Sequence, residues 1–225
     1  MINVIYGDKN RIKISKSEVC RYMGYKAADI INPLDKLITD NIQRVAQALK
    51  CKACYDIFPV QAESDGNLNL TFMSAKSKNL AKALCKCSEF ILFTATIGIE
   101  IDRIIAKASR LSPTDALIFQ AAGAAAIEDW CDIICENFRL DFEKRGKYLT
   151  PRFSPGYGDF PLSAQKEIFR ALECPKKIGV SLTDSLMMVP SKSVSAIIGI
   201  TDEKPDFSEN KCKSCNNKEC EFRKE

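Results

Sequence analysis

Apolar residues recur at helical spacing along much of the chain. Leu34, Ile38, Ile42, Val45 and Leu49 return every three or four positions, which places them on one face of a helix. Ser15-x-x-Glu18 predicts a capping box, and Asn32-Pro33 and Ser112-Pro113 predict an N-cap followed by a proline in the first turn, so further helices are expected behind these signals. The helices expected from these patterns span residues 15–22, 33–50, 77–87, 113–144 and 161–172, with one more starting near residue 99.

Other stretches show the patterns of strands. Residues 90–96 are a continuous apolar run, which predicts a central strand. Residues 54–60 and the alternating stretch 68–72 flank the turn signal Asp65-Gly66, which predicts a hairpin. Residues 180–189 and 194–200 are expected to be strands joined by a turn at 190–193. Helices grouped between hairpins favour an α+β fold, a single domain with a mainly antiparallel twisted sheet and flanking helices.

Composition narrows the class of protein. The chain has 225 residues and a modest net charge of +4, which suits one domain and makes no nucleic-acid-binding stripe. No apolar run approaches the length of a membrane helix, and the N-terminus lacks the pattern of a signal peptide, so we expect a cytoplasmic protein. The chain contains no histidine, which excludes Ser-His-Asp and Cys-His catalysis and every histidine-ligated metal site.

A proline- and glycine-rich stretch from Thr150 to Pro161 is neither a helix nor a central strand, because its prolines and glycines disfavour both. Pro155-Gly156 predicts a turn. Arg152 offers a planar fork that matches a carboxylate, and the ring of Tyr157 can sit over a cation. The stretch therefore suits a small anionic or zwitterionic ligand; the alternative is a rigid connector between core elements.

The motif Arg152-x-x-x-Gly156-Tyr157, followed by Pro-Leu-x-x-Gln-Lys, resembles the S-adenosylmethionine loop of the activation domain of cobalamin (vitamin B12)-dependent methionine synthase. A second segment, residues 178–195, resembles the family pattern G-x-x-L-T-(E/D)-S followed by M-x-P-x-x-S-V-S. The two segments occur in family order and cover about 147–200 closely, whereas 1–90 is distant. The resemblance implies an activation domain over residues 1–201. The polar, proline-containing stretch that follows predicts a linker, so residues 202–225 are expected to be a linker and a cysteine-rich tail.

The resemblance also implies a function. The chain is expected to be a stand-alone reactivation subunit that binds S-adenosylmethionine and presents its methyl group for reductive methylation of cob(II)alamin in trans. It would be an accessory part of methionine synthase activity, with the cobalamin carried by a partner methionine synthase or related corrinoid methyltransferase. A flavodoxin or ferredoxin-type electron donor is a further expected partner. The implied ligand contacts are Arg152 to the carboxylate, the backbone of Phe153, Ser154, Pro155 and Gly156 to the adenosyl part, and Tyr157 beside the sulfonium or the corrinoid.

The tail carries the remaining chemical signal. Cys212-x-x-Cys215, with Cys220 five residues later, has the spacing of metal-binding thiolates and no surrounding apolar pattern. Zinc and an iron–sulfur cluster both suit such ligands, and Cys174 or the pair Cys51 and Cys54 are candidate further donors. The alternative to a metal site is an unstructured tail with free thiols. The alternative functions of the chain are an iron–sulfur corrinoid reductive activator and a zinc-knuckle binding module without catalytic function.

Two further features have structural and functional interpretations. Glu100 and Asp102 follow the expected central strand, where a carboxylate can meet a ligand amino group or begin a helix. The small residues at 121–126 suit tight packing against the sheet, and less readily a ligand contact.

Overall fold

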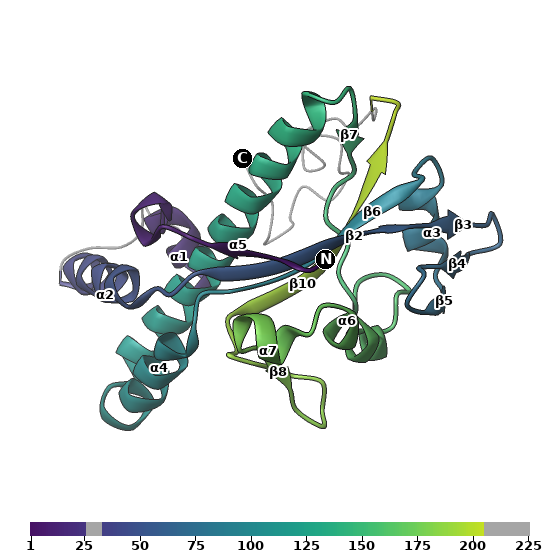
Figure 1. Cartoon of the computed structure of the whole chain (residues 1–225). Helices are drawn as coiled ribbons and strands as arrows, with labels where there is room; N and C mark the ends of the chain where they lie inside the picture. Colours follow the sequence, from purple (N-terminus) through teal and green to yellow (C-terminus); the bar gives the residue numbers. More distant parts are fainter. Residues whose placement is uncertain (26–32, 205–225) are drawn as a thin grey trace.

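A computed structural model describes residues 1–25 and 33–204 of the chain. In this part, five strands form an antiparallel sheet in the order β1-β2-β6-β10-β7, with helices on both faces and smaller strands on one of them (Figure 1). The expected α+β fold with an antiparallel sheet is confirmed. The sheet strands are β1 (Asn3–Tyr6), β2 (Lys52–Pro59), β6 (Glu89–Thr96), β7 (Tyr148–Leu149) and β10 (Ser193–Thr201).

The centre of the sheet is β6, as the apolar run predicted. Seven of its eight residues are buried, and it pairs with β2 on one side and β10 on the other. Alternate side chains enter different cores: Ile91 and Phe93 point to one face, and Phe90 and Leu92 to the other. A strand buried on both faces is apolar throughout, which explains why the sequence shows no alternation here.

Within the described residues, four helices cover one face of the sheet, and α5 is by far the longest of them (Figure 1). The Ser112 hydroxyl accepts a hydrogen bond from the Asp115 amide at 3.3 Å, and Pro113 occupies the first turn, so the predicted start of this helix is confirmed. A Cβ on Gly123 would lie 3.1 Å from Ile101 of the neighbouring helix, so the small residues serve close packing. These helices are α1 (Lys16–Tyr22), α2 (Leu34–Ala48), α4 (Ile99–Leu111) and α5 (Pro113–Glu143).

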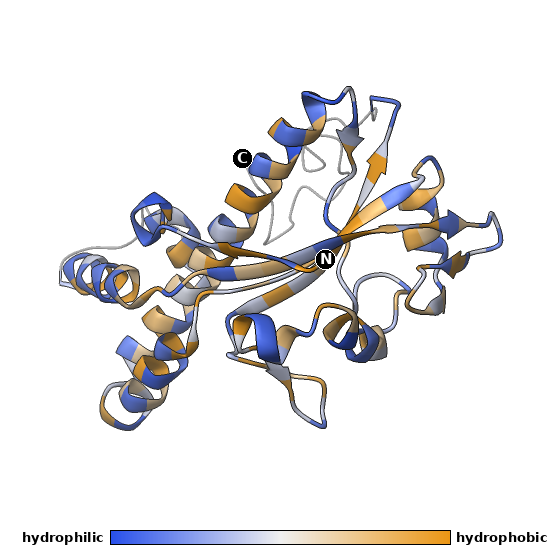
Figure 2. Cartoon of the chain, in the orientation of Figure 1, coloured by the Kyte–Doolittle hydropathy of each residue, from blue (hydrophilic) through white to orange (hydrophobic). Residues whose placement is uncertain are grey.

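The other face is covered by short pieces rather than by one long helix. Their apolar side chains form a second core with Phe90, Leu92 and Ile197 of the sheet. The central strands are mostly apolar, whereas the surrounding helices mix polar and apolar residues (Figure 2). The pieces are β3 (Gln61–Ala62), β4 (Asn67–Asn69), β5 (Ser74–Lys76), α3 (Lys78–Leu84), the 3-10 turn η3 (Leu162–Ala164), α6 (Gln165–Ala171), α7 (Cys174–Ile178), β8 (Ser181–Leu182) and β9 (Met188–Val189). The 3-10 turn η1 (Lys9–Arg11) lies beside α2 on the first face.

The predicted hairpin of residues 54–60 with 68–72 is wrong. The turn at Asp65-Gly66 joins β3 to β4, which form a small separate sheet with β5. The longer strand β2 pairs with β1 and β6 instead. Apolar side chains on both faces of β2, such as Ala53 and Cys54, are buried only inside the large sheet, and this outweighs the local turn signal.

The predicted strand over residues 194–200 is confirmed as β10, whereas the predicted single strand over 180–189 is wrong. Only β8 and β9 form, as a short hairpin, while β10 pairs with β6 and β7. Between β8 and β9, the Thr183 hydroxyl accepts a hydrogen bond from the Met187 amide at 3.1 Å, so side-chain bonds replace a longer ladder.

The predicted capping box at Ser15 and Glu18 does not form, although helix α1 does. The Ser15 hydroxyl pairs with that of Ser17 at 2.7 Å, and Glu18 pairs with Arg21. Pro33 precedes α2 at its N-cap, and Asn32 lies outside the described residues. Among the described helices, none has the length and apolar character needed to cross a membrane.

Candidate functional site

The proline- and glycine-rich stretch forms a loop between β7 and η3, and backbone hydrogen bonds within the loop hold its shape. The Gly156 amide donates to the carbonyl of Phe160 at 2.8 Å, and the Phe160 amide donates to the carbonyl of Tyr157 at 3.1 Å. Gly156 has φ +90°, a conformation that other residues adopt only with strain. Pro155 and Phe160 are buried beneath the loop, while Tyr157 has 70% of its surface exposed. The predicted turn at Pro155-Gly156 is confirmed.

The N-terminal end of the loop is fixed to the sheet by its backbone. The amide of Phe153 donates to the carbonyl of Ile197 at 2.9 Å, and the Ile197 amide donates back at 2.8 Å. The Phe153 ring lies against Phe160, with ring centroids 6.4 Å apart. Both backbone polar groups of Phe153 are therefore already paired. In the turn, the Ser154 carbonyl accepts from the Tyr157 amide at 3.2 Å, so the groups without a partner among the described residues are the Ser154 amide and the carbonyls of Pro155 and Gly156.

The C-terminal end of the loop is fixed to the start of α3 by Asp159. Its carboxylate accepts hydrogen bonds from the Ser77 hydroxyl at 2.5 Å, the Lys78 amide at 2.7 Å and the Asn79 amide at 3.1 Å. These hydrogen bonds lower the pKa of Asp159, and the bond from Ser77 has the largest effect. A carboxylate with three donors at a helix start holds the loop in one place.

Arg152 directly precedes the anchor at Phe153, and its side chain reaches the surface of α5. Its Nη2 donates to Asp132 at 2.7 Å and to Glu128 at 3.1 Å, and 24% of the side chain is exposed. Burial acts to lower the pKa of Arg152, but the neighbouring Cys131, Cys135, Glu128 and Asp132 raise it overall. The result is a half-buried guanidinium that keeps its charge beside the loop.

The N–H groups of Arg152 are only partly used by these pairs. A guanidinium carries five N–H donors. The two bonds from Nη2 account for two of them, and Nε and Nη1 have no partner among the described residues. This leaves donors for a carboxylate, the group that an arginine fork matches best.

The two carboxylates on α5 were missed by the sequence analysis. Glu128 and Asp132 are four residues apart, which places them on the same face of a helix. Like charges at this spacing destabilise a helix unless a cation lies near them, and that spacing was the available signal. The candidates that the sequence offered lie elsewhere: Glu100 pairs with Arg103 at 2.7 Å, and Asp102 accepts hydrogen bonds from the amide and hydroxyl of Ser191 at 2.7 and 2.5 Å.

The expected metal site cannot be compared with the structure at its three main ligands, since Cys212, Cys215 and Cys220 lie outside the described residues. Of the further donors, Cys51 and Cys54 enter opposite cores of the sheet and so do not converge. Cys54 and Cys174 do meet, with their sulfur atoms 4.0 Å apart, and both are fully buried. Residues 1–25 and 33–204 contain no group of three or more side chains that could hold a metal ion.

The bond to Cys174 and burial raise the pKa of Cys54, which therefore stays a thiol at neutral pH. A protonated thiol in an apolar core behaves as a small hydrophobic side chain. The pair is accordingly part of the packing between β2 and α7.

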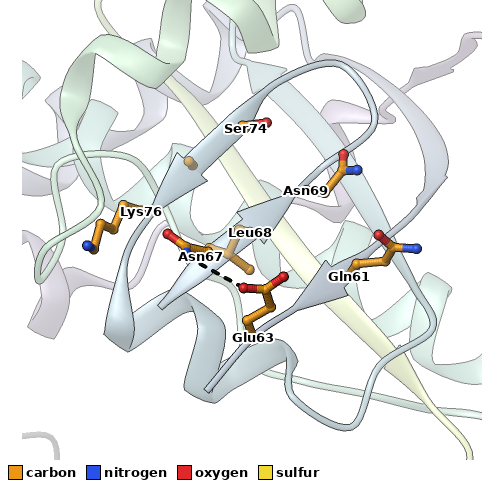
Figure 3. Close-up of a pocket in the computed structure, with 8 residues that line it drawn as sticks. Gln61, Glu63, Asn67, Leu68, Asn69, Ser74 and Lys76 are labelled. Atoms are coloured by element: carbon orange, nitrogen blue, oxygen red, sulfur yellow. Dashed lines mark hydrogen bonds between the residues drawn. The ribbon is translucent and has the colours of Figure 1, made fainter. Parts of the chain in front are cut away.

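A depression of about 510 Å³ lies on the small sheet of β3, β4 and β5. Figure 3 shows its polar rim, in which Asn67 and Glu63 form a hydrogen bond of 3.5 Å. No residue of the loop from 150 to 161 lines it. Because its polar side chains are on an open surface, this depression has less of the character of a ligand site than the half-buried Arg152.

Residues 127–225 match the profile of a family described as vitamin B12 dependent methionine synthase, activation domain. This segment contains the loop, its carboxylate partners on α5 and strand β10. Over this segment, which is less than half of the chain, the sequence is thus similar to the methionine synthase activation domain family. The matched range also includes the cysteine tail.

The activation-domain fold extends beyond this segment. The chain is similar in structure to one described as the crystal structure of the MetH reactivation domain bound to AdoHcy, with a TM-score of 0.68 and 15% sequence identity. The alignment covers 92% of this chain and 80% of that one. Comparison with curated protein sequences gave no match. The fold similarity thus includes the N-terminal part, where the sequence resemblance was distant.

Proposed function

We propose that this chain binds S-adenosylmethionine at the 150–161 loop and presents its methyl group to the cobalamin of a partner protein. The observation that carries the proposal is the half-buried Arg152, which retains unpartnered donors beside a rigid glycine turn. In a MetH reactivation domain of the same fold, the bound molecule is AdoHcy. That ligand has the same adenosyl and amino-acid parts as S-adenosylmethionine.

Each part of the loop has a role in this proposal. Arg152 binds the carboxylate of the ligand. The adenosyl part lies against the backbone from Ser154 to Gly156, where the Ser154 amide and the carbonyls of Pro155 and Gly156 have no partner among the described residues. The exposed ring of Tyr157 covers the sulfonium or borders the corrinoid, since an aromatic face attracts a cation.

S-adenosylmethionine supplies an electrophilic methyl group, and the residues of this chain hold it in place. The loop is bonded to the sheet at Phe153 and to α3 at Asp159, so the position of Arg152 and Tyr157 is set before the ligand arrives. Fixed orientation of two reactants can account for roughly 7–11 kcal/mol of a reaction barrier. Such a role requires no proton transfer, which agrees with a chain without histidine.

The proposed partner is a methionine synthase or a related corrinoid methyltransferase that carries the cobalamin, with this chain acting in trans as a stand-alone reactivation subunit. A flavodoxin or ferredoxin-type donor supplies the electron. Such donors are commonly acidic, and the net charge of +4 favours their approach.

Binding is tested by isothermal titration of the full chain with S-adenosylmethionine. We expect Arg152→Ala to weaken binding about ten- to a hundredfold, the effect of one or two charge-assisted hydrogen bonds. Arg139→Ala is the matched control, because Arg139 also pairs with two carboxylates on α5, Glu136 and Glu143, but lies away from the loop. Absence of binding by the wild-type chain, or equal affinities for the two variants, would refute the proposed site.

Reactivation is tested separately, with a methyltransferase in the cob(II)alamin state, S-adenosylmethionine and a reductant. Addition of the wild-type chain should restore methyltransferase turnover, and Arg152→Ala should restore less at low S-adenosylmethionine. Binding without reactivation would retain the ligand site and reject the function in trans.

A further inference from the structure

The side chain of Arg152 is held by two carboxylates that belong to another element. Glu128 and Asp132 lie one turn apart on α5, and both accept from the same nitrogen, Nη2. We call these three residues the Arg152 triad. The loop alone does not fix a long, flexible side chain, so the direction of the guanidinium depends on α5.

The two carboxylates are themselves open to solvent. Their side chains are 48% and 65% exposed, whereas that of Arg152 is 24% exposed. Exposed ion pairs contribute little to stability. The triad is therefore poorly explained as a device for folding, and its consequence is the orientation of the one half-buried member.

We propose that Glu128 and Asp132 are positioning residues, which hold Arg152 so that Nε and Nη1 receive the carboxylate of the ligand. This inference rests on the proposed function. An arginine that is ordered before binding loses less rotamer freedom when the ligand arrives, which strengthens binding. Neither carboxylate needs to touch the ligand for this effect.

Charge and positioning predict opposite signs for the removal of these carboxylates. Neutralising two anions beside a guanidinium would, by charge alone, strengthen the binding of a carboxylate. If the anions act by holding Arg152, the same change weakens binding. Glu128→Gln and Asp132→Asn, singly and together, preserve side-chain size and so isolate this difference.

Three ligands distinguish positioning from direct contact. AdoHcy has both the carboxylate and the amino group, and no net charge. Its deaminated analogue keeps only the carboxylate. Methylthioadenosine lacks the entire amino-acid part.

The experiment is titration of each ligand into the full-length chain and its variants. We expect the double variant to bind AdoHcy and the deaminated analogue about tenfold more weakly, the effect of about one charge-assisted hydrogen bond. Its affinity for methylthioadenosine should not change. Glu136→Gln is the matched control, since Glu136 lies on the same helix and pairs with Arg139 at 2.5 Å. Thermal unfolding of each single variant shows whether the fold is retained.

Other outcomes overturn the inference in distinguishable ways. Equal or tighter binding of AdoHcy by the double variant would reject positioning and leave the proposed function intact. A loss confined to AdoHcy would show that the carboxylates bind the amino group. Equal losses for all three ligands would indicate a purely structural role, and no binding of AdoHcy to the wild type would reject the proposed function together with the inference.

Discussion

The two faces of the central sheet are built in different ways. One face is covered mainly by α5, a single helix of 31 residues with fourteen buried positions. The opposite face is covered by short elements, such as α3 and α6 with seven residues each and α7 with five. Short helices are marginal by themselves, so the second face depends on side-chain bonds between its pieces.

The 150–161 loop is attached to both faces of the sheet. We call the face covered mainly by α5 the continuous face, and the face covered by the short elements the assembled face. Asp159 attaches it to the start of α3 on the assembled face, and Arg152 attaches it to α5 on the continuous face. The first attachment is a carboxylate with three donors; the second is a pair of ionic contacts at a partly exposed arginine. The comparison suggests that the assembled face sets the shape of the loop, whereas α5 sets the direction of its charge.

The largest expected effect comes from removing a ring on either face of β6. Phe93 and Phe90 are both fully buried, the first beneath α5 and the second beneath the short elements. Each change to alanine should lower the free energy of unfolding by about 3–5 kcal/mol, measured by chemical denaturation. In Phe90→Ala, hydrogen exchange should accelerate most in α3 and β3–β5, whereas Phe93→Ala should affect the domain more evenly.

The exposed Leu117 of α5 supplies the control for this pair, since Leu117→Ala should change stability by no more than about 0.5 kcal/mol. Identical exchange patterns in the two phenylalanine variants would mean that the faces open as one unit. The proposed difference in their construction would then have no energetic counterpart.

The second prediction concerns the glycine turn of the loop. Gly156 has φ +90°, and an added Cβ would find no atom closer than 3.4 Å, so alanine is disfavoured by backbone strain and not by crowding. Gly156→Ala should cost about 1–3 kcal/mol in unfolding experiments. Gly146 has φ +69° after α5 with no neighbour within 4 Å, which makes Gly146→Ala the matched control.

The two glycine variants should differ in ligand binding. Only Gly156→Ala should lower the affinity for S-adenosylmethionine measured by isothermal titration, because only Gly156 belongs to the loop of the proposed site. A similar loss in Gly146→Ala would attribute the effect to general destabilisation.

The third prediction compares helix starts on the two faces. The Ser77 hydroxyl accepts from the Leu80 amide at 3.0 Å and donates to Asp159. The Ser15 hydroxyl, in contrast, pairs with the Ser17 hydroxyl and does not cap its helix. Ser77→Ala should therefore lower thermal stability, at a cost of about 1–2 kcal/mol, and Ser15→Ala should cost a few tenths. Equal melting temperatures for the two variants would contradict the dependence of the assembled face on side-chain bonds.

The sequence predicted best what local patterns determine. The apolar run of β6, the cap and proline that begin α5 and the bend at Pro155-Gly156 each follow from residues next to one another. Pairing between strands was predicted poorly. Strand β2 pairs with β1 and β6 because this buries its side chains on both faces, whereas the prediction relied on the nearest turn. Local chemistry alone does not contain that information.

The site shows the same division. Arg152, Gly156 and Tyr157 were proposed from one short motif, and their assignment as ligand contacts stays a prediction. Glu128, Asp132 and Asp159 were not proposed, since their roles depend on α5 and α3 meeting a loop that is distant from α3 in sequence. Helical spacing of the two α5 carboxylates indicated a shared face, but not the arginine that lies beside it.

The smallest expected effect is a pH dependence of the anchor on the assembled face. Asp159 has its pKa lowered by the bond from Ser77 and by the amides at the start of α3. An acid with a lowered pKa in the folded state stabilises the protein above its unfolded pKa, about 3.9 for aspartate, and loses that contribution as pH falls through the folded value. The contribution is thus complete at neutral pH and disappears only below about pH 4. Asp159→Asn should lower the melting temperature at neutral pH, and the gap from wild type should narrow below pH 4. A gap that stayed constant through this range would show that the ionised carboxylate is not what holds the loop to α3.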